Sequence, residues 1–508
     1  MTTTSLTPPT GGRRAPLALA ATLALVLAGC GSLTRSPGAE PPPATAVPAT
    51  WAVAPASASS AASAASAASA PALELADWPD WVRDDRLRQV IARSLEHNRD
   101  LRVALLTMAQ ARAAYDIQDA ARGPTVNATG GLSASRTPAQ ASSSGQTVNT
   151  RTYSVGLGVS AWELDLFGRV QSLADSALAS YLQTEAAQRS TRLSLIGDVA
   201  TAWLTLASDR QQLALARRTL DSQRETYRLT EGRKAAGAVS GLTLAQARTS
   251  VESARVSLVA ADSQVQRDRY ALELLVGQTL PDELLPPDDL ASSDGSTDAG
   301  STALVAVPAG LPSTVLQRRP DVVAAEQQLR ASQADLAAAR AALYPRISLT
   351  ASAGTASREL GTLFQGGAWS LAPSVSLPIL DGGAARATVR RAEITSDLRL
   401  ASYDKTLQTA FKEVADALAV RASLAERLDA QRALVDAAQR SYDLATARQQ
   451  AGADSFLTVL DAQRTLLSAQ QGLITLQLTE AGNRVTLYKV LGGSYAQAQA
   501  QPAASGPR

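Results

Sequence analysis

Side chains able to do covalent chemistry are scarce in this sequence. Its 508 residues include one histidine, His97, and one cysteine, Cys30. A Ser/His/Asp or Cys/His nucleophile set needs a histidine beside the nucleophile, and zinc sites usually draw on several Cys and His ligands. No cysteine or suitable acidic partner stands near His97, which favours a plain surface or packing role. We therefore expect no catalytic residues, no metal site and no cofactor.

The cysteine ends a segment that has the layout of a secretory signal. Two arginines precede an apolar run over 17–28, which is too short to span a bilayer permanently, and Leu27-Ala-Gly-Cys30 follows. This ending resembles the bacterial lipobox, which implies cleavage before Cys30, acylation of its thiol and, with Gly31 next, sorting to the outer membrane. We expect a signal peptide at 1–29 and an acylated, low-complexity tether at 30–77. An ordinary signal peptide with a cysteine at its end is the plainer alternative.

One polar motif occurs twice and has the residues for a partner-binding turn. The pattern Arg-x-x-x-Gly-x-x-Ser starts at Arg233 and again at Arg448 (448 − 233 = 215). Glycine can end one helix in a left-handed conformation, and serine can cap the next helix. A well-made turn with no other role is one interpretation. Because such a turn would end a very long helical pair, it is also the first surface that a partner meets, so we predict docking at Arg233, Gly237, Val239, Ser240, Arg448, Gly452 and Ser455.

The two turns belong to a duplication that organises the chain. Residues 168–277 recur without insertion as 383–492 (383 − 168 = 492 − 277 = 215). A repeat of this size favours one composite body over several separate domains. We expect a first repeat at 78–277, an irregular connector at 278–312, a second repeat at 313–493 and a disordered tail at 494–508.

Each repeat reads as a helix, a β-hairpin and a long helical hairpin. The first helix is expected from Asp84 to Arg122. Apolar residues then alternate with polar ones, which predicts hairpins at 124–165 and 345–381. Helical periodicity follows, and a helix of about 65 residues would be roughly 100 Å long. That length indicates a coiled coil or helical tube made by hairpins at 168–277 and 383–492.

The four predicted strands are near the length that crosses a bilayer when tilted. Strands inside hydrocarbon must close into a barrel, because unpaired backbone groups there are costly, and known barrels have at least eight strands. Four strands per chain therefore require association: two copies would give eight strands and three would give twelve. Conduction favours three, because an eight-stranded barrel is filled by its own side chains.

Several segments carry a resemblance to a known family. They are 311–326, which contains Arg318-Arg-Pro-Asp321, then 338–350, Trp162-Glu-Leu-Asp-Leu-Phe-Gly-Arg169 and 451–464. Together they resemble the TolC family of outer-membrane efflux proteins, in the NodT-type lipoprotein subgroup that serves resistance-nodulation-division pumps. The likeness runs from about Trp78 to Gly493.

The resemblance implies an α+β membrane protein of homotrimeric form. Twelve strands, four from each chain, would form one outer-membrane β-barrel, and a periplasmic α-helical coiled-coil barrel would continue it. The implied function is the exit channel of a tripartite efflux pump, passive and without a catalytic step. The implied partners are two sister chains, the outer-membrane lipid, a periplasmic adaptor and an inner-membrane resistance-nodulation-division pump. The net charge of +2 gives no sign of a nucleic-acid partner.

The resemblance also places a pore constriction early in the last helix. It implies that Asp461 points into the periplasmic mouth, where three copies would form a carboxylate ring that favours cations. Thr458 stands where some members have a second aspartate. A plainly solvated aspartate is the alternative at this position. For the chain as a whole, a type I protein secretion channel and a lipid-anchored coiled-coil scaffold without a pore are the other two hypotheses.

Overall fold

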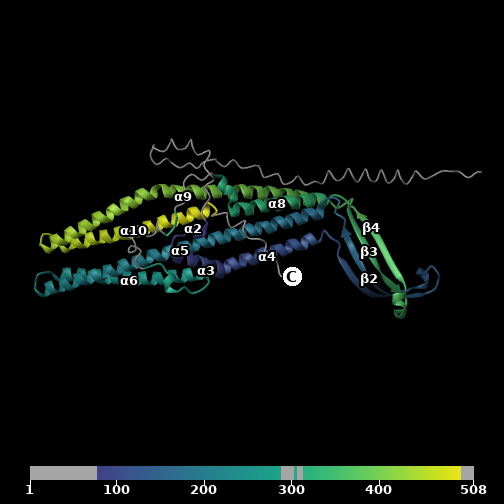
Figure 1. Cartoon of the computed structure of the whole chain (residues 1–508), viewed down its shortest axis with the longest axis horizontal. Helices are drawn as coiled ribbons and strands as arrows, with labels where there is room; N and C mark the ends of the chain where they lie inside the picture. The colour runs from purple at the N-terminus through teal and green to yellow at the C-terminus, as the bar shows by residue number, and fades with distance from the viewer. Residues whose placement is uncertain (1–76, 288–302, 306–312, 494–508) are drawn as a thin grey trace, which may run out of the picture. The chain divides into compact units, whose positions relative to one another are not determined.

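A computed structural model describes residues 77–287, 303–305 and 313–493 (Figure 1). The signal peptide, Cys30, most of the tether, most of the connector and the tail lie outside the described residues. The described chain forms two compact units. Unit 1 contains Met108–Thr184 and Ala324–Tyr403; unit 2 contains the described parts of Thr45–Thr107, Glu185–Val323 and Asp404–Arg508.

Unit 1 is built around one antiparallel sheet of four strands in the order β1-β2-β3-β4. The strands are β1 (Val126–Thr137), β2 (Val148–Glu163), β3 (Arg346–Ser357) and β4 (Gly367–Ser376). Short 3-10 helices, η2 (Ala139–Ala141) and η5 (Leu360–Gln365), lie between the strands of the two hairpins. Within the described residues β1 and β4 each pair on one side only, so both edges of the sheet offer free backbone groups. The two hairpins expected from alternation are confirmed.

The middle of the sheet, between β2 and β3, is unusually close. Gly156 pairs with Gly354, and a Cβ on Gly354 would lie 2.3 Å from the carbonyl oxygen of Val155. Only glycine fits this approach. The register then shifts between Val159 and Trp162, with the intervening Ala161 at a positive φ of 50°. This irregularity bends the strand and re-aims its final residues, a feature that simple alternation does not reveal.

The motif Trp162–Arg169 stabilises the connection between the end of β2 and the helix that follows. The Nε of Arg169 donates to Glu163 at 2.8 Å, and its Nη2 donates to the other carboxylate oxygen at 2.6 Å. Phe167 stacks on Tyr344, with 5.0 Å between ring centroids. These contacts join the start of a long helix to β2 and to the segment before β3, which explains the residue types of the motif.

Unit 2 consists of helices, several of which also contribute residues to unit 1. No helix in the described part of the chain is both long and apolar enough to cross a membrane. The helices of the chain are α2 (Trp78–Trp81), α3 (Asp85–His97), α4 (Arg99–Ala120), α5 (Arg169–Ala235), α6 (Gly241–Val276), η3 (Asp282–Leu284), η4 (Ser313–Arg318), α8 (Pro320–Ala341), α9 (Ala384–Gln450) and α10 (Phe456–Val490).

The main core of unit 2 gathers apolar residues from α3, α5, α6, α10 and the segment around residue 304. Trp203 is its largest fully buried side chain, and Trp81 stacks on Tyr488 with ring centroids 4.2 Å apart. Beyond this core, small apolar clusters pack α9 against α10. In α6 the buried side chains include Ala247, Ala254, Val265 and Leu272.

The expected single helix from Asp84 to Arg122 was wrong, because Asn98 divides it into α3 and α4. The backbone of Asn98 is extended, with φ −61° and ψ 132°. Its side-chain oxygen accepts a hydrogen bond from the amide of Leu101 at 2.8 Å, which caps α4. Its Nδ2 donates to the carbonyl oxygen of Leu275 at 2.8 Å. The break thus fixes α4 to the end of α6.

Candidate functional site

The two helical hairpins end in turns that share one backbone. We call residues 233–240 tip 1 and residues 448–455 tip 2. Gly237 has φ 74° and Gly452 has φ 77°, both in the left-handed region. The amide of Ala238 donates to the carbonyl oxygen of Arg233 at 2.8 Å, and the equivalent bond from Ala453 in tip 2 measures 2.9 Å. Both helices therefore end in the glycine-dependent C-terminal motif expected from the sequence.

Serine begins the returning helix in both tips. Ser240 accepts a hydrogen bond from the amide of Thr243 at 3.2 Å, and Ser455 accepts one from the amide of Thr458 at 3.4 Å. The hydroxyl of Thr458 also lies 3.2 Å from that of Ser455. The backbone roles predicted for both glycines and both serines are thus present, and Thr458 takes part in the cap. These contacts explain why both turns need a glycine and a serine.

The side chains of the tips differ although their backbones agree. Arg448 donates to Asp454 through Nε at 2.7 Å and through Nη2 at 3.0 Å. The hydrogen bond from Arg448 lowers the pKa of Asp454. Val239 occupies the position that matches Asp454 (454 − 239 = 215), so tip 1 has no such pair. The sequence analysis selected Arg448 but missed Asp454. The available signal was that only the second copy has a carboxylate six residues after the arginine.

Asp461 lies on α10, one turn after Thr458, and its side chain is exposed. Its carboxylate makes no ion pair within the described residues. The matching residue of the first repeat is Gln246 (461 − 246 = 215), so only the second of these two matching positions carries a carboxylate. An exposed carboxylate early in α10 is compatible with a pore constriction formed by several chains. It is equally compatible with a carboxylate that only contacts solvent.

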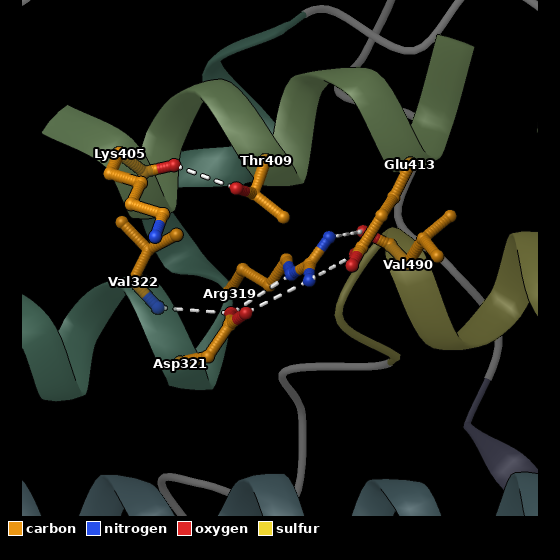
Figure 2. Close-up of polar contacts among 7 residues, drawn as sticks. All are labelled: Arg319, Asp321, Val322, Lys405, Thr409, Glu413 and Val490. Atoms are coloured by element: carbon orange, nitrogen blue, oxygen red, sulfur yellow. Dashed lines mark hydrogen bonds and ion pairs between the residues drawn. The ribbon is translucent and has the colours of Figure 1, made fainter. Parts of the chain in front are cut away.

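A second polar centre surrounds Arg319, which sequence reasoning used only as part of a family signature (Figure 2). Its Nε and Nη2 donate to the two carboxylate oxygens of Asp321 at 2.9 and 2.8 Å. Its Nη2 also bonds Glu413 of α9, and its Nη1 donates to the carbonyl oxygen of Val490 at 3.2 Å. The guanidinium therefore ties the start of α8 to α9 and to the end of α10.

Arg319 stays charged although its side chain is only 11 % exposed. Burial lowers the pKa of Arg319, but the hydrogen bonds and charges of Asp321 and Glu413 outweigh burial and raise it. An arginine with its hydrogen bonds directed this way is a structural tie rather than a reactive group. The sequence indicates this tie through an arginine directly before a helix that begins with Pro-Asp. The guanidinium of such an arginine can reach the aspartate two residues later.

A cavity of about 740 Å³ lies beside Arg319, between α5, α9 and α10. Every charged residue that lines it is already in an ion pair, such as Lys489 with Asp198 at 3.3 Å. The side-chain Nδ2 of Asn483 donates to the carbonyl oxygen of Ala417 at 2.9 Å. The described residues hold no cluster of three or more His, Cys, Asp and Glu side chains arranged for a metal ion. The cavity thus offers volume but no unpaired charge.

Comparison with protein families gives one match that follows the duplication. The model of the family described as outer membrane efflux protein matches residues 90–278 and 311–493. Each half of the match covers the helix, β-hairpin and helical hairpin of one repeat, and together the halves cover more than two thirds of the chain.

Curated relatives and solved structures agree with this family. The antibiotic efflux pump outer membrane protein ArpC of Pseudomonas putida is 46 % identical over 420 residues, which cover 82 % of this chain and 85 % of ArpC. The toluene efflux pump outer membrane protein TtgC, also of P. putida, gives the same identity and the same coverage. The crystal structure of the open state of the MtrE outer membrane channel of Neisseria gonorrhoeae matches with a TM-score of 0.77 and 34 % identity, covering 91 % of this chain and 98 % of MtrE.

These likenesses span both repeats, the four-stranded sheet and the long helical hairpins, and the relatives are transport proteins of the outer membrane. The chain belongs to the outer membrane efflux protein family and has the fold of a TolC-like channel subunit.

Proposed function

We propose that three copies of this chain form the outer-membrane exit channel of a tripartite efflux pump, through which antibiotics or organic solvents leave the periplasm passively. The observation that carries the proposal is the four-stranded sheet with two open edges, β1 and β4. In a bilayer such edges must be paired. If β4 of each copy pairs with β1 of the next copy, the sheets of all copies join into one closed barrel. The substrates are suggested by the names of ArpC and TtgC.

In this proposal the protein binds and guides substrates but carries out no catalytic step. The energy comes from an inner-membrane pump, of the resistance-nodulation-division class that the sequence resembles, and a periplasmic adaptor connects the two. Tips 1 and 2 are the docking surface for that adaptor, since both hairpins end there in exposed residues (Figure 1). An acyl chain on Cys30, which lies outside the described residues, would add a membrane anchor.

Asp461 is proposed to line the periplasmic constriction, with Thr458 one turn before it. Three exposed carboxylates close to a threefold axis repel one another, so the constriction is easier to close when cations are bound. Docking at the tips would spread the last turns of the helices and thereby open this ring.

The decisive experiment combines conductance with complementation. The purified protein is reconstituted in a planar bilayer, and the gene is expressed in a bacterium that lacks its own efflux channel and is therefore sensitive to antibiotics. We expect stepwise ion conductance and restored resistance, and resistance should require a matching adaptor and pump. A protein that forms no pore and remains monomeric in lipid would contradict the proposal and favour a scaffold.

A further inference from the structure

The two tips have the same backbone but differ in the charge of their side chains. In tip 2 the guanidinium of Arg448 is used within the chain, because it bonds both carboxylate oxygens of Asp454. Side-chain exposure is 61 % for Arg448 and 23 % for Asp454, so the arginine lies over the carboxylate. The pair links the last turn of α9 to the residue before the N-cap of α10 and closes the turn with a bidentate contact.

Tip 1 has two cations and no internal anion. Arg233 and Lys234 are exposed, and neither makes an ion pair or side-chain hydrogen bond within the described residues. Val239 offers no acceptor at the place of Asp454. The acidic residue nearest in sequence, Glu231, lies two residues before the tip and accepts a hydrogen bond from the hydroxyl of Tyr227 at 3.3 Å. Tip 1 is therefore a free positive surface.

We propose that tip 1 is the electrostatic anchor for the periplasmic adaptor, with Arg233 and Lys234 binding carboxylates on the adaptor, while tip 2 docks through backbone and shape alone. This inference rests on the proposed function, because it names the chemistry of one partner surface. A guanidinium and an ammonium on consecutive residues are matched best by acidic side chains, and the arginine can bind one carboxylate through two hydrogen bonds. A homotrimer presents three anchors and three neutral tips, so the adaptor meets two chemically different surfaces.

Long-range attraction of this kind acts mainly on the association rate and is screened by salt. Removing the free cations of tip 1 should therefore slow association and weaken its dependence on salt. The arginine of tip 2 is already neutralised by Asp454, so removing both members of this pair leaves the charge of tip 2 unchanged and should change the rate much less. The shared backbone makes each tip the control for the other.

The experiment measures binding of the full-length trimer in lipid nanodiscs to the purified adaptor of the P. putida toluene pump, by surface plasmon resonance. Rates are compared at about 50 and about 300 mM salt, between which the screening length falls by more than half. The double variant R233Q/K234Q should associate about ten-fold more slowly at low salt, whereas R448Q/D454N, which keeps tip 2 neutral, should change the rate by less than about two-fold. Gel filtration checks that each variant is still a trimer.

A reciprocal exchange sharpens the test. Val239→Asp puts a carboxylate within reach of Arg233, as Asp454 is in tip 2, and should slow association in the same direction as the double variant. Asp454→Val frees Arg448 and should speed association. Equal losses of association rate at both tips, or a wild-type association rate that does not depend on salt, would contradict the anchor role of tip 1. Either result would leave the proposed channel function unaffected. Failure of the wild-type trimer to bind the adaptor at all would overturn docking itself and, with it, the proposed pump.

Discussion

The Nη1 of Arg319 donates a hydrogen bond to the backbone carbonyl oxygen of Val490 at 3.2 Å. The first repeat makes the same connection with a smaller side chain, since the Nδ2 of Asn98 donates to the carbonyl oxygen of Leu275 at 2.8 Å. The positions correspond through the duplication (490 − 275 = 215 and 319 − 98 = 221). In both repeats a residue just before a helix satisfies a carbonyl at the end of the returning helix, which otherwise lacks a partner.

Replacing Arg319 should destabilise unit 2. Arg319→Met keeps most of the volume but leaves Asp321, Glu413 and the carbonyl of Val490 without their shared donor. Because the two carboxylates are partly exposed, we expect a loss of about 2 kcal/mol rather than the larger cost of a fully buried pair. Thermal unfolding of the purified trimer checks this. Arg86→Met, at an exposed position of α3, is the control and should shift the midpoint little; equal shifts would argue against the tie.

Asn98 can be dissected by two substitutions. Asn98→Asp keeps the oxygen that caps α4 but removes the donor to Leu275, whereas Asn98→Ala removes both. We expect the alanine variant to lose about 1 to 2 kcal/mol of stability and the aspartate variant to lie between it and the wild type. Hydrogen exchange of the amides at the start of α4 gives a local measurement. If Asn98→Ala exchanged like the wild type there, the cap would have no energetic weight.

The sequence predicted the elements well because its signals are local. The duplication, the alternation at Tyr153, Val155 and Leu157, and the glycine-serine turns each depend on neighbours a few residues apart. Asn98 escaped prediction because its decisive partner, Leu275, is distant in the sequence. The surrounding residues continue a good helical pattern, so the break is set by a tertiary contact that overrides propensity.

The polar sites were harder to predict than the elements. The contact of Arg319 with Glu413 joins helices 94 residues apart, and nothing local announces it. The tips were identified from their repeated residues, but the ion pair in one of them depends on a single difference, Val239 against Asp454. A comparison of the positions at which the two repeats differ would have revealed the ion pair in tip 2.

The close approach of β2 and β3 should make Gly354 intolerant of any side chain. A Cβ there would lie 2.3 Å from the carbonyl oxygen of Val155, and neither backbone can move without breaking the pairing. We expect Gly354→Ala to cost at least about 1 to 3 kcal/mol, the range for an overpacked site, and to lower the yield of assembled channel. Gly366→Ala, which has open space around its Cβ, is the matched control. The amount of trimer in outer-membrane fractions decides between them.

Asp461 should set the ion preference if it lines the constriction. Asp461→Asn removes the carboxylate with little change of shape, so the cation preference should fall, whereas Asp461→Glu should retain it. The reversal potential across a salt gradient in a planar bilayer measures the preference directly. Identical potentials for wild type and Asp461→Asn would place the exposed side chain of Asp461 outside the pore.

Two carboxyl groups face each other between α5 and α6 and should make unit 2 sensitive to pH. Burial, with the hydrogen bond and charge of Asp268, raises the pKa of Asp209 to about 7, while a hydrogen bond from Gln264 acts in the opposite direction. One carboxylate oxygen of Asp268 is buried and finds no partner among the described residues unless Asp209 is protonated. The second repeat has Leu424 and Asn483 at these positions (424 − 209 = 483 − 268 = 215) and avoids the pair.

The sign of the effect follows from proton binding. Between the ordinary aspartate pKa of about 4 and the raised value, the folded protein holds a proton that the unfolded chain has lost, so stability falls as pH rises through this window. Because Asp209 is partly exposed, the slope should be well below the limit of about 1.4 kcal/mol per pH unit for one proton. In Asp209→Asn the midpoint temperature of thermal unfolding should change less with pH between about pH 4 and 7. Asp221→Asn, on the exposed face of α5, should leave the pH dependence of the midpoint unchanged. A slope of the opposite sign, or one that survives Asp209→Asn, would show that other groups control the pH response.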